Sequence, residues 1–284
     1  MNTKENKKRR NLSPILFLLV FLLGAVILFY PRISFWLAEY NQNVAIQSYN
    51  SAVSSLTEEE KEQIWEQAKD YNRRMVESVV KDPFASTENI DPFDEYFDTL
   101  DVGEGTMGYI RIPGIEVRMP IYHGTSDEVL EKGVGHIKAT ALPIGGEGTH
   151  SVLTGHTGLH TAEMFDNLDR LEIGDEFYVE VLDHTLAYRV DQIEVVEPDD
   201  VSKLQAVEGE DFVTLVTCTP YGVNSHRLLV RGERCEYNPD ADDDDSGKAL
   251  FPWWIVTLVA GLLVLLILIG RWTKRRAERR ANSV

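Results

Sequence analysis

Two charge-free hydrophobic segments lie near the two ends of the chain. Residues 13–30 (SPILFLLVFLLGAVILFY) and residues 250–270 (LFPWWIVTLVAGLLVLLILIG) contain no charged side chain. Each is close to the roughly 20 apolar residues that a membrane-spanning helix needs. Aromatic residues stand at their edges, where amphipathic rings settle at a bilayer interface. The pattern predicts transmembrane helices over residues 13–31 and 250–270.

The polar ends of the chain indicate how these helices are oriented. Residues 1–12 hold five Lys and Arg, and residues 271–284 hold six. Such basic flanks stay in the cytoplasm, so we expect both termini inside the cell and the residues between the two helices outside it. The first segment could instead be a cleaved signal peptide. It lacks a small-x-small cleavage site, which favours an uncleaved anchor.

Helical patterning continues after the first hydrophobic segment. Thr57 and Glu60 fit a capping box, and apolar residues then recur at helical spacing. We predict helices at about 36–55 and 58–79, within an N-terminal helical region of residues 32–80.

Residues 81–106 change character and form a predicted loop. Two Asp-Pro-Phe triplets lie here, at residues 82–84 and 91–93. Proline fixes its own φ and restricts the residue before it, so neither triplet belongs inside a helix. Loops of this length are often functional or disordered.

The pattern over residues 107–235 is typical of β structure. Short β-branched or aromatic runs alternate with Gly, Pro, Asn and Asp. Seven or eight such strands predict a mostly β domain, either a closed barrel or a sandwich. One short helix is expected near 160–169. Residues 236–249 (EYNPDADDDDSGKA) are predicted to be an acidic linker to the second membrane helix.

Composition excludes several classes of protein. The net charge is −18, which argues against a nucleic-acid partner. Two cysteines, Cys218 and Cys235, are too few for a disulfide scaffold. The carboxylates lack the spacing of a calcium loop, and no His-Glu-x-x-His, Gly-x-Ser-x-Gly or phosphate-binding Gly-Lys-Ser/Thr motif occurs.

Cys218 ends a predicted strand and is followed by a turn that contains Pro220 and Gly222. The next strand begins near Ser225, so a hairpin brings Arg227 close to Cys218. A nucleophilic cysteine reacts as its thiolate, which a fixed cation favours. Arginine is always charged and can also donate hydrogen bonds to a developing oxyanion. The alternative is a buried, inert cysteine beside a surface arginine.

A cysteine enzyme also needs an acid or base, usually histidine. His156 is the favoured candidate, because it stands where a strand ends and a Gly-flanked loop begins. His150 and His226 are weaker candidates. The seven histidines are His123, His136, His150, His156, His160, His184 and His226. The order His, Cys, Arg along the chain differs from papain-type proteases, and the caspase signature is absent.

These motifs resemble one known family. TLVTCTPYG (residues 214–222) and NSHRLLVRG (residues 224–232) are similar to the active-site signature of sortases, in particular class C, the pilin-polymerising type of Gram-positive bacteria. GVGH (residues 133–136) and TGH (residues 154–156) also match. The resemblance runs from about residue 45 to 235, and both predicted anchors fit it.

The resemblance implies a closed eight-stranded β-barrel over residues 107–235, with Cys218, His156 and Arg227 as catalytic residues. Cys218 would attack the Thr–Gly bond of an LPxTG-like sorting motif in a pilin or surface protein and form a thioacyl-enzyme. A lysine amine of the next pilin would then attack, giving an isopeptide bond. No metal or organic cofactor is implied.

Class C members also carry a lid over the site, anchored by an Asp-Pro-aromatic triplet. The resemblance assigns this role to Asp82, Pro83 and Phe84, which directly follow the second predicted helix. The triplet at residues 91–93 is the alternative. In the family the Asp faces the catalytic Arg, and the ring covers the Cys.

Three competing interpretations remain. The chain could be a housekeeping sortase that attaches proteins to peptidoglycan, although the second anchor and the Asp-Pro-Phe loop favour class C. It could be an anchored surface protein, but no LPxTG-like motif precedes Leu250. It could also be a cysteine protease that uses water as the acceptor.

Overall fold

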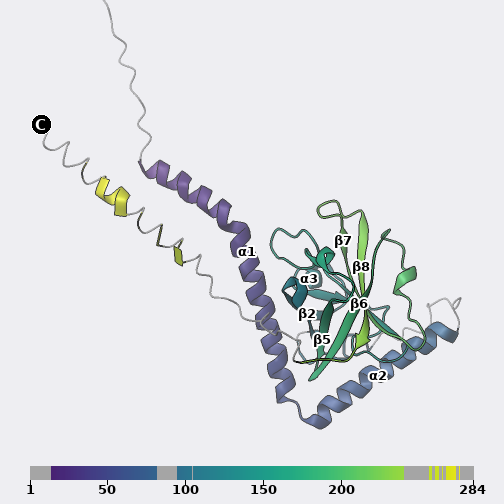
Figure 1. Ribbon diagram of the computed structural model, residues 1–284. Helices are drawn as coiled ribbons and strands as arrows, with labels where there is room; N and C mark the ends of the chain where they lie inside the picture. The colour runs from purple at the N-terminus through teal and green to yellow at the C-terminus, as the bar shows by residue number, and fades with distance from the viewer. Residues whose placement is uncertain are drawn as a thin grey trace, which may run out of the picture. The chain divides into compact units, whose positions relative to one another are not determined.

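The computed structural model describes most of the predicted N-terminal helices and the β domain (Figure 1). The described residues are 14–81, 95–103 and 105–239, with short pieces between 256 and 275. The chain forms two units, Met1–Gly247 and Lys248–Val284, and the β domain lies in the first. Both Asp-Pro-Phe triplets and residues 240–249 of the acidic linker lie outside the described residues.

Two long helices precede the β domain. α1 (Pro14–Ser55) runs without a break through the first hydrophobic segment and the first predicted N-terminal helix. Among the described residues one helix, Leu19–Ser55, is long and apolar enough to cross a membrane. α2 (Glu58–Lys81) starts at the predicted capping box. There the Thr57 amide donates to Glu60 Oε2 at 2.8 Å, and the Glu60 amide donates to Thr57 Oγ1 at 3.2 Å.

Eight strands close into a barrel in the order β1-β2-β3-β4-β7-β8-β6-β5, which confirms the predicted closed barrel. The strands are β1 (Thr106–Ile112), β2 (Val117–His123), β3 (Val134–His136), β4 (Thr149–Thr154), β5 (Glu176–Val181), β6 (His184–Val196), β7 (Asp211–Thr219) and β8 (His226–Cys235). Short helices connect some of them: η1 (Pro113–Ile115), α3 (Asp127–Leu130), η2 (Leu168–Arg170) and η3 (Ser202–Leu204).

The helix predicted near 160–169 is wrong apart from the single turn of η2. The Asp166 carboxylate explains the difference, because it accepts from the Gly158 amide at 2.8 Å and from the Met164 amide at 3.0 Å. The Phe165 amide donates to His156 O at 3.0 Å. These bonds hold the segment as a loop, since the amides bond to a side chain and to a distant carbonyl rather than within a helix.

Strand alternation sorts side chains between the inside and the outside of the barrel. On β7, Val213 and Leu215 are fully buried in the main core. Val216 points the other way and forms a second, smaller cluster with Val152 and Leu229. The outer face of β4, β7 and β8 is therefore apolar as well, because successive side chains of a strand point to opposite faces.

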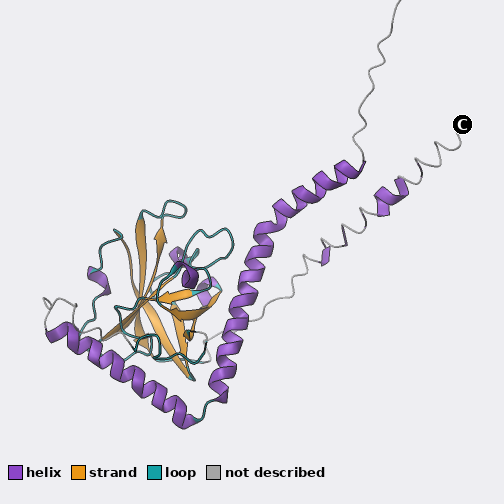
Figure 2. Ribbon diagram, turned by 180° about the vertical axis from the view of Figure 1, so that it is seen from behind, coloured by secondary structure: helices purple, strands orange, loops and turns teal. Residues whose placement is uncertain are grey.

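Both long helices pack against the barrel, whose orange strands Figure 2 shows with α1 and α2 beside them. Tyr49 of α1 is buried, and its hydroxyl donates to Met107 O at 3.0 Å and accepts from the Leu182 amide at 2.7 Å. On α2, the buried Asn72 side chain bonds both the carbonyl and the amide of Leu142, at 3.1 and 2.7 Å. These bonds attach each helix to the barrel, because a buried polar group left without a partner destabilises the fold.

The described C-terminal part of the predicted lid loop, residues 95–103, is fixed to the barrel by Tyr96. This ring is fully buried, and its hydroxyl lies 2.9 Å from His136 Nδ1 while accepting from the Gly124 amide at 2.9 Å. His136 Nε2 lies 2.8 Å from Ala141 O. Burial lowers the pKa of His136 from 6.5 to about 4, because the charged ring would lose its hydration.

We expect this histidine to make the fold sensitive to acid. The pKa of His136 is lower in the folded chain than in the unfolded chain, so the unfolded chain binds more protons between pH 6.5 and 4. The free energy of unfolding should therefore fall as the pH drops through this window, by up to about 3 kcal/mol from His136 alone. Urea unfolding at pH 7 and pH 4.5 measures the change. His136→Gln should show a smaller loss than wild type, and equal losses would contradict the prediction.

Candidate active site

Cys218 and Arg227 face each other across the β7–β8 hairpin. Their Cα atoms are direct partners in the antiparallel register, and both side chains are half-buried. Directly opposed residues on one face have Cβ atoms about 5 Å apart. The hairpin therefore holds a thiol beside a permanent cation at the end of two paired strands.

His156 reaches the same end of the barrel from β4. This strand runs parallel to β7, with Thr154 opposite Val216. Beyond the ladder, the Gly155 amide donates to Val216 O at 3.1 Å, and Thr217 Oγ1 donates to Gly155 O at 2.7 Å. The backbone just before His156 is thus bonded to the two residues that precede Cys218.

Gly155 is required by the packing of the loop that carries His156. A Cβ at this position would lie 2.8 Å from a ring carbon of Phe165, which is itself buried. Real Cβ atoms do not approach other atoms so closely, so a larger residue would displace the ring or the loop. Gly155 of the Thr-Gly-His motif is therefore needed for the path of the backbone, and its role is not chemical.

Two backbone carbonyls of the β7–β8 hairpin accept hydrogen bonds from the Arg227 guanidinium and hold it in place. Its Nη1 donates to Asn224 O at 3.3 Å and to His226 O at 3.0 Å. No carboxylate among the described residues pairs with it. In the same part of the chain, neither Cys218 Sγ nor the His156 ring has a hydrogen-bond partner. Such bonds often form only with substrate present, so this geometry suits a resting site.

The two weaker histidine candidates have other partners. His150 is buried, with Nδ1 3.0 Å from Gln205 O and Nε2 2.7 Å from Thr214 Oγ1. His226 Nδ1 lies 2.8 Å from Ser225 Oγ. Both rings are therefore engaged by the fold.

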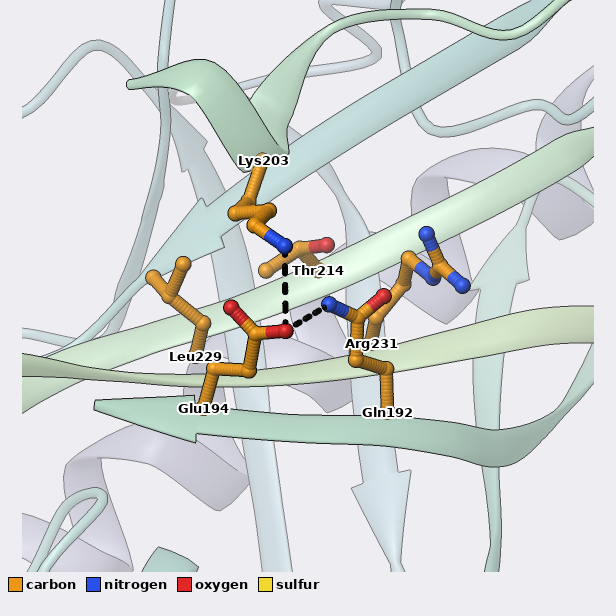
Figure 3. A pocket seen from close by; sticks show the side chains of 6 residues that line it. All are labelled: Gln192, Glu194, Lys203, Thr214, Leu229 and Arg231. Atoms are coloured by element: carbon orange, nitrogen blue, oxygen red, sulfur yellow. Dashed lines mark hydrogen bonds and ion pairs between the residues drawn. The ribbon is translucent and has the colours of Figure 1, made fainter. Parts of the chain in front are cut away.

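Next to Cys218, the outer face of the barrel carries an apolar cluster, here called the floor, which the sequence did not predict. Val152, Val216 and Leu229 are buried there, and Leu204 of η3 packs against them. Farther from Cys218 the floor becomes polar, and Lys203 Nζ lies 3.1 Å from Glu194 Oε1 across a small pocket (Figure 3). The residues that line this pocket are Gln192, Glu194, Lys203, Thr214, Leu229 and Arg231. Along the outer face of β7 and β8, the reactive side chains are therefore followed by the apolar floor and then by the polar pocket.

The remaining cysteine is separate from this site. Cys218 and Cys235 are both free thiols. Cys235 ends β8 opposite Ala187 of β6. No cluster of three or more His, Cys, Asp or Glu that could hold a metal ion occurs among the described residues. The chemistry available here is that of a thiol, an imidazole and a guanidinium.

Comparisons with known proteins place this barrel in a family. A model of the sortase domain matches residues 110–235. Sortase C1 from Streptococcus agalactiae is 44% identical, with a TM-score of 0.64, and the match covers 68% of this chain and 99% of that one. Sortase C from Streptococcus pneumoniae, whose structure was reported for catalysis and pilin substrate specificity, is 44% identical, with a TM-score of 0.59, over 68% and 97%.

A sortase C from Clostridium perfringens was solved with the C-terminal cell wall sorting motif. It is 41% identical, with a TM-score of 0.59, over 68% of this chain and 99% of that one. Sortase SrtE1 of Streptomyces coelicolor is 33% identical over 155 residues, and this chain covers only 43% of its length. The chain belongs to the sortase family of cysteine transpeptidases, and within it to class C.

Proposed function

We propose that the protein is a membrane-anchored cysteine transpeptidase that cleaves an LPxTG-like sorting motif between Thr and Gly and joins the new acyl end to a lysine of a pilin. The observation that carries this proposal is the pairing of Cys218 with Arg227, with the backbone before His156 bonded beside them. Membership of class C supports the choice of substrate.

In the first step the Cys218 thiolate attacks the carbonyl carbon of the motif threonine. Arg227 donates hydrogen bonds to the oxyanion that forms, which lowers the barrier because the positive charge is already in place. The C–N bond to glycine then breaks, and His156 gives its proton to the leaving amine. The products are a thioester on Cys218 and a free amino-terminal glycine peptide.

In the second step a pilin lysine amine attacks the thioester. His156, now neutral, accepts the proton that the amine loses, and the C–S bond breaks to restore the thiolate. An amide between the threonine carbonyl and the lysine nitrogen results. Water in place of lysine would give hydrolysis, and a peptidoglycan amine would give the housekeeping reaction.

The apolar floor supports a motif that begins with Leu and Pro. Val216 and Leu229 each lie two positions from the reactive pair, on β7 and β8. Val216 and Leu229 are themselves buried, and Leu204 of η3 packs against them, so a motif whose threonine lies at Cys218 would meet the rim of this cluster. Apolar contact of its Pro and Leu with that rim would add binding energy beside the bond that is cleaved.

We also propose that Asp82, Pro83 and Phe84 form a lid that must open, with the triplet at residues 91–93 as the alternative. Both triplets lie outside the described residues. Arg227 has no carboxylate partner in the described part of the chain, which leaves its charge available to a lid aspartate. A lid phenylalanine over Cys218 would shield the thiol from water.

Two membrane spans, with both termini in the cytoplasm and the barrel outside, complete the proposal. The apolar window of α1 has none of its residues buried within the fold, so this surface suits lipid. The hydrophobic residues 250–270 and the basic residues after them support a second span.

The test is to mix the full chain in detergent with an LPxTG peptide and a lysine-bearing pilin peptide, and to identify the products by mass spectrometry. The joined peptide is expected, and only the hydrolysed acid would favour a protease. A peptidoglycan-type amine as sole effective acceptor would favour the housekeeping alternative. The double variant Asp82→Ala with Phe84→Ala runs alongside, so that a closed lid is not mistaken for an inactive site.

Arg227→Lys is expected to lower kcat for the peptide by about 10²- to 10³-fold, with little change in KM. Lysine keeps the charge but cannot present the planar fork of donors that an oxyanion and a substrate carbonyl share. Steady-state rates on the peptide measure this effect. Arg189→Lys, which alters an exposed ion pair with Glu176, is the matched control and should change kcat less than about 3-fold. If the two variants lowered kcat equally, Arg227 would have no specific role in the reaction.

A further inference from the structure

One exposed aromatic ring stands at the rim of the barrel, close to the reactive pair. Tyr221 lies in the turn between β7 and β8, three residues after Cys218, and is 65% exposed. The turn has an ordered backbone, because the amides of Val223 and Asn224 both donate to Pro220 O, at 3.0 and 2.9 Å. The fold therefore holds a large apolar ring in solvent beside the site.

The Tyr221 ring lies against the loop that carries His156. Gly158 of that loop has a φ of +78° and no side chain. A Cβ built on Gly158 would lie 3.7 Å from Cε2 and 3.8 Å from Cζ of the ring, and 3.9 Å from the Gly222 amide nitrogen. These are ordinary contact distances between carbon atoms. Among the described residues, the missing Cβ thus leaves a slot about one methylene wide between the Gly158 backbone and the Tyr221 ring.

This slot and the apolar floor lie on opposite sides of Cys218. The motif that we propose meets the floor at Val216, two positions before Cys218 on β7. Tyr221 comes after Cys218, beyond the end of β7 at Thr219. The glycine that leaves, and the amine that replaces it, therefore belong on the side of the Tyr221 ring.

A carboxylate next to the slot supplies negative charge. Asp166 accepts from the Gly158 amide at 2.8 Å and from the Met164 amide at 3.0 Å. It is half-buried, and in the described part of the chain no Lys or Arg pairs with it. An ammonium group from solvent would be attracted to it. The face of an aromatic ring also attracts a cation, and it packs well on the methylenes of a lysine.

We propose that Tyr221 and Gly158 form an acceptor slot, which holds the aliphatic stem of the incoming lysine so that its amine reaches the thioester on Cys218. This rests on the proposed function and deepens it by naming the residues that favour lysine over water. Asp166 attracts the lysine before it enters the slot, and His156 then accepts its proton as in the second step above. Without the ring the lysine is no longer oriented, so water competes better for the thioester.

The test compares two acceptors with the full chain in detergent and an LPxTG peptide. One is the lysine-bearing pilin peptide, and the other is hydroxylamine, which has no aliphatic stem. Tyr221→Ala should lower the ratio of lysine-joined to hydrolysed product by about 10-fold. The rate of thioacyl formation and the yield with hydroxylamine should each change less than about 2-fold. Tyr221→Phe should keep the lysine ratio, because the ring and not its hydroxyl forms the slot. Mass spectrometry measures all the products.

Val223→Ala is the matched control, because Val223 is 69% exposed on the same turn. It should change the lysine ratio less than about 2-fold. An unchanged lysine ratio in Tyr221→Ala would overturn the slot. An equal loss with hydroxylamine, or in Val223→Ala, would also overturn it, since the whole turn would then be disturbed. If no form gave a thioacyl adduct, the lid variant included, the proposed function itself would fail, which is a different result from an altered ratio of products.

Discussion

Replacing Cys218 with alanine is expected to lower turnover of an LPxTG peptide by about 10⁴-fold or more. The loss should be this large because both steps pass through a bond to the sulfur, and loss of a catalytic nucleophile removes most of an enzyme's rate enhancement. The barrel should stay folded, since Cys218 is half-buried at a strand end and alanine leaves the β7–β8 ladder intact. Peptide cleavage and the thermal midpoint of each variant are the measurements.

Cys235→Ala is the matched control for this substitution. Cys235 is also a half-buried free thiol at a strand end, but burial raises its pKa, which disfavours the reactive thiolate. Its removal should change turnover less than about 2-fold. If Cys235→Ala were inactive and Cys218→Ala active, the nucleophile would lie at the other end of β8 and the site would be wrongly assigned.

The second large effect is expected at His156. His156→Ala should lower kcat by about 10²- to 10⁴-fold, because the leaving amine would have no acid and the attacking lysine no base. Thiol labelling of Cys218 should survive in this variant if Arg227 is the group that favours the thiolate. Rates of peptide cleavage and of labelling by a small alkylating reagent separate the two roles.

His226→Gln is the control for this variant, because His226 lies beside Arg227 and near the same rim. Its ring is bonded to Ser225, and a change of less than about 3-fold is expected. If His226→Gln lost activity while His156→Ala kept it, His226 and not His156 would be the acid–base residue.

Much of the barrel could be predicted from the sequence, because β-branched runs are separated by strong turn residues. The hairpin after Cys218 is the clearest case. Pro220 and Gly222 end one strand, and nine residues of spacing place Arg227 opposite Cys218. The capping box at Thr57 is equally local, and its bonds form as predicted. These features depend on neighbouring residues, which a sequence displays directly.

Other features depend on residues far apart in the chain. The segment near 160–169 has helical composition, yet Asp166 bonds two amides and its backbone bonds to the loop of His156. The apolar floor beside Cys218 was missed because β7 is apolar on both faces, so alternation cannot tell core from surface. The contact of Gln42 with Met164 spans 122 positions, and no local pattern signals it.

The most direct test of the proposed chemistry is to trap the thioacyl intermediate. The full chain, its Cys218→Ala form and the Asp82→Ala, Phe84→Ala double variant would each be mixed with an LPxTG peptide, without an amine acceptor. Intact mass spectrometry and peptide mapping would follow. We expect an adduct with the mass of the peptide through its threonine, located on Cys218 and absent from Cys218→Ala. An adduct on Cys235, or none in any form including the lid variant, would contradict the assignment.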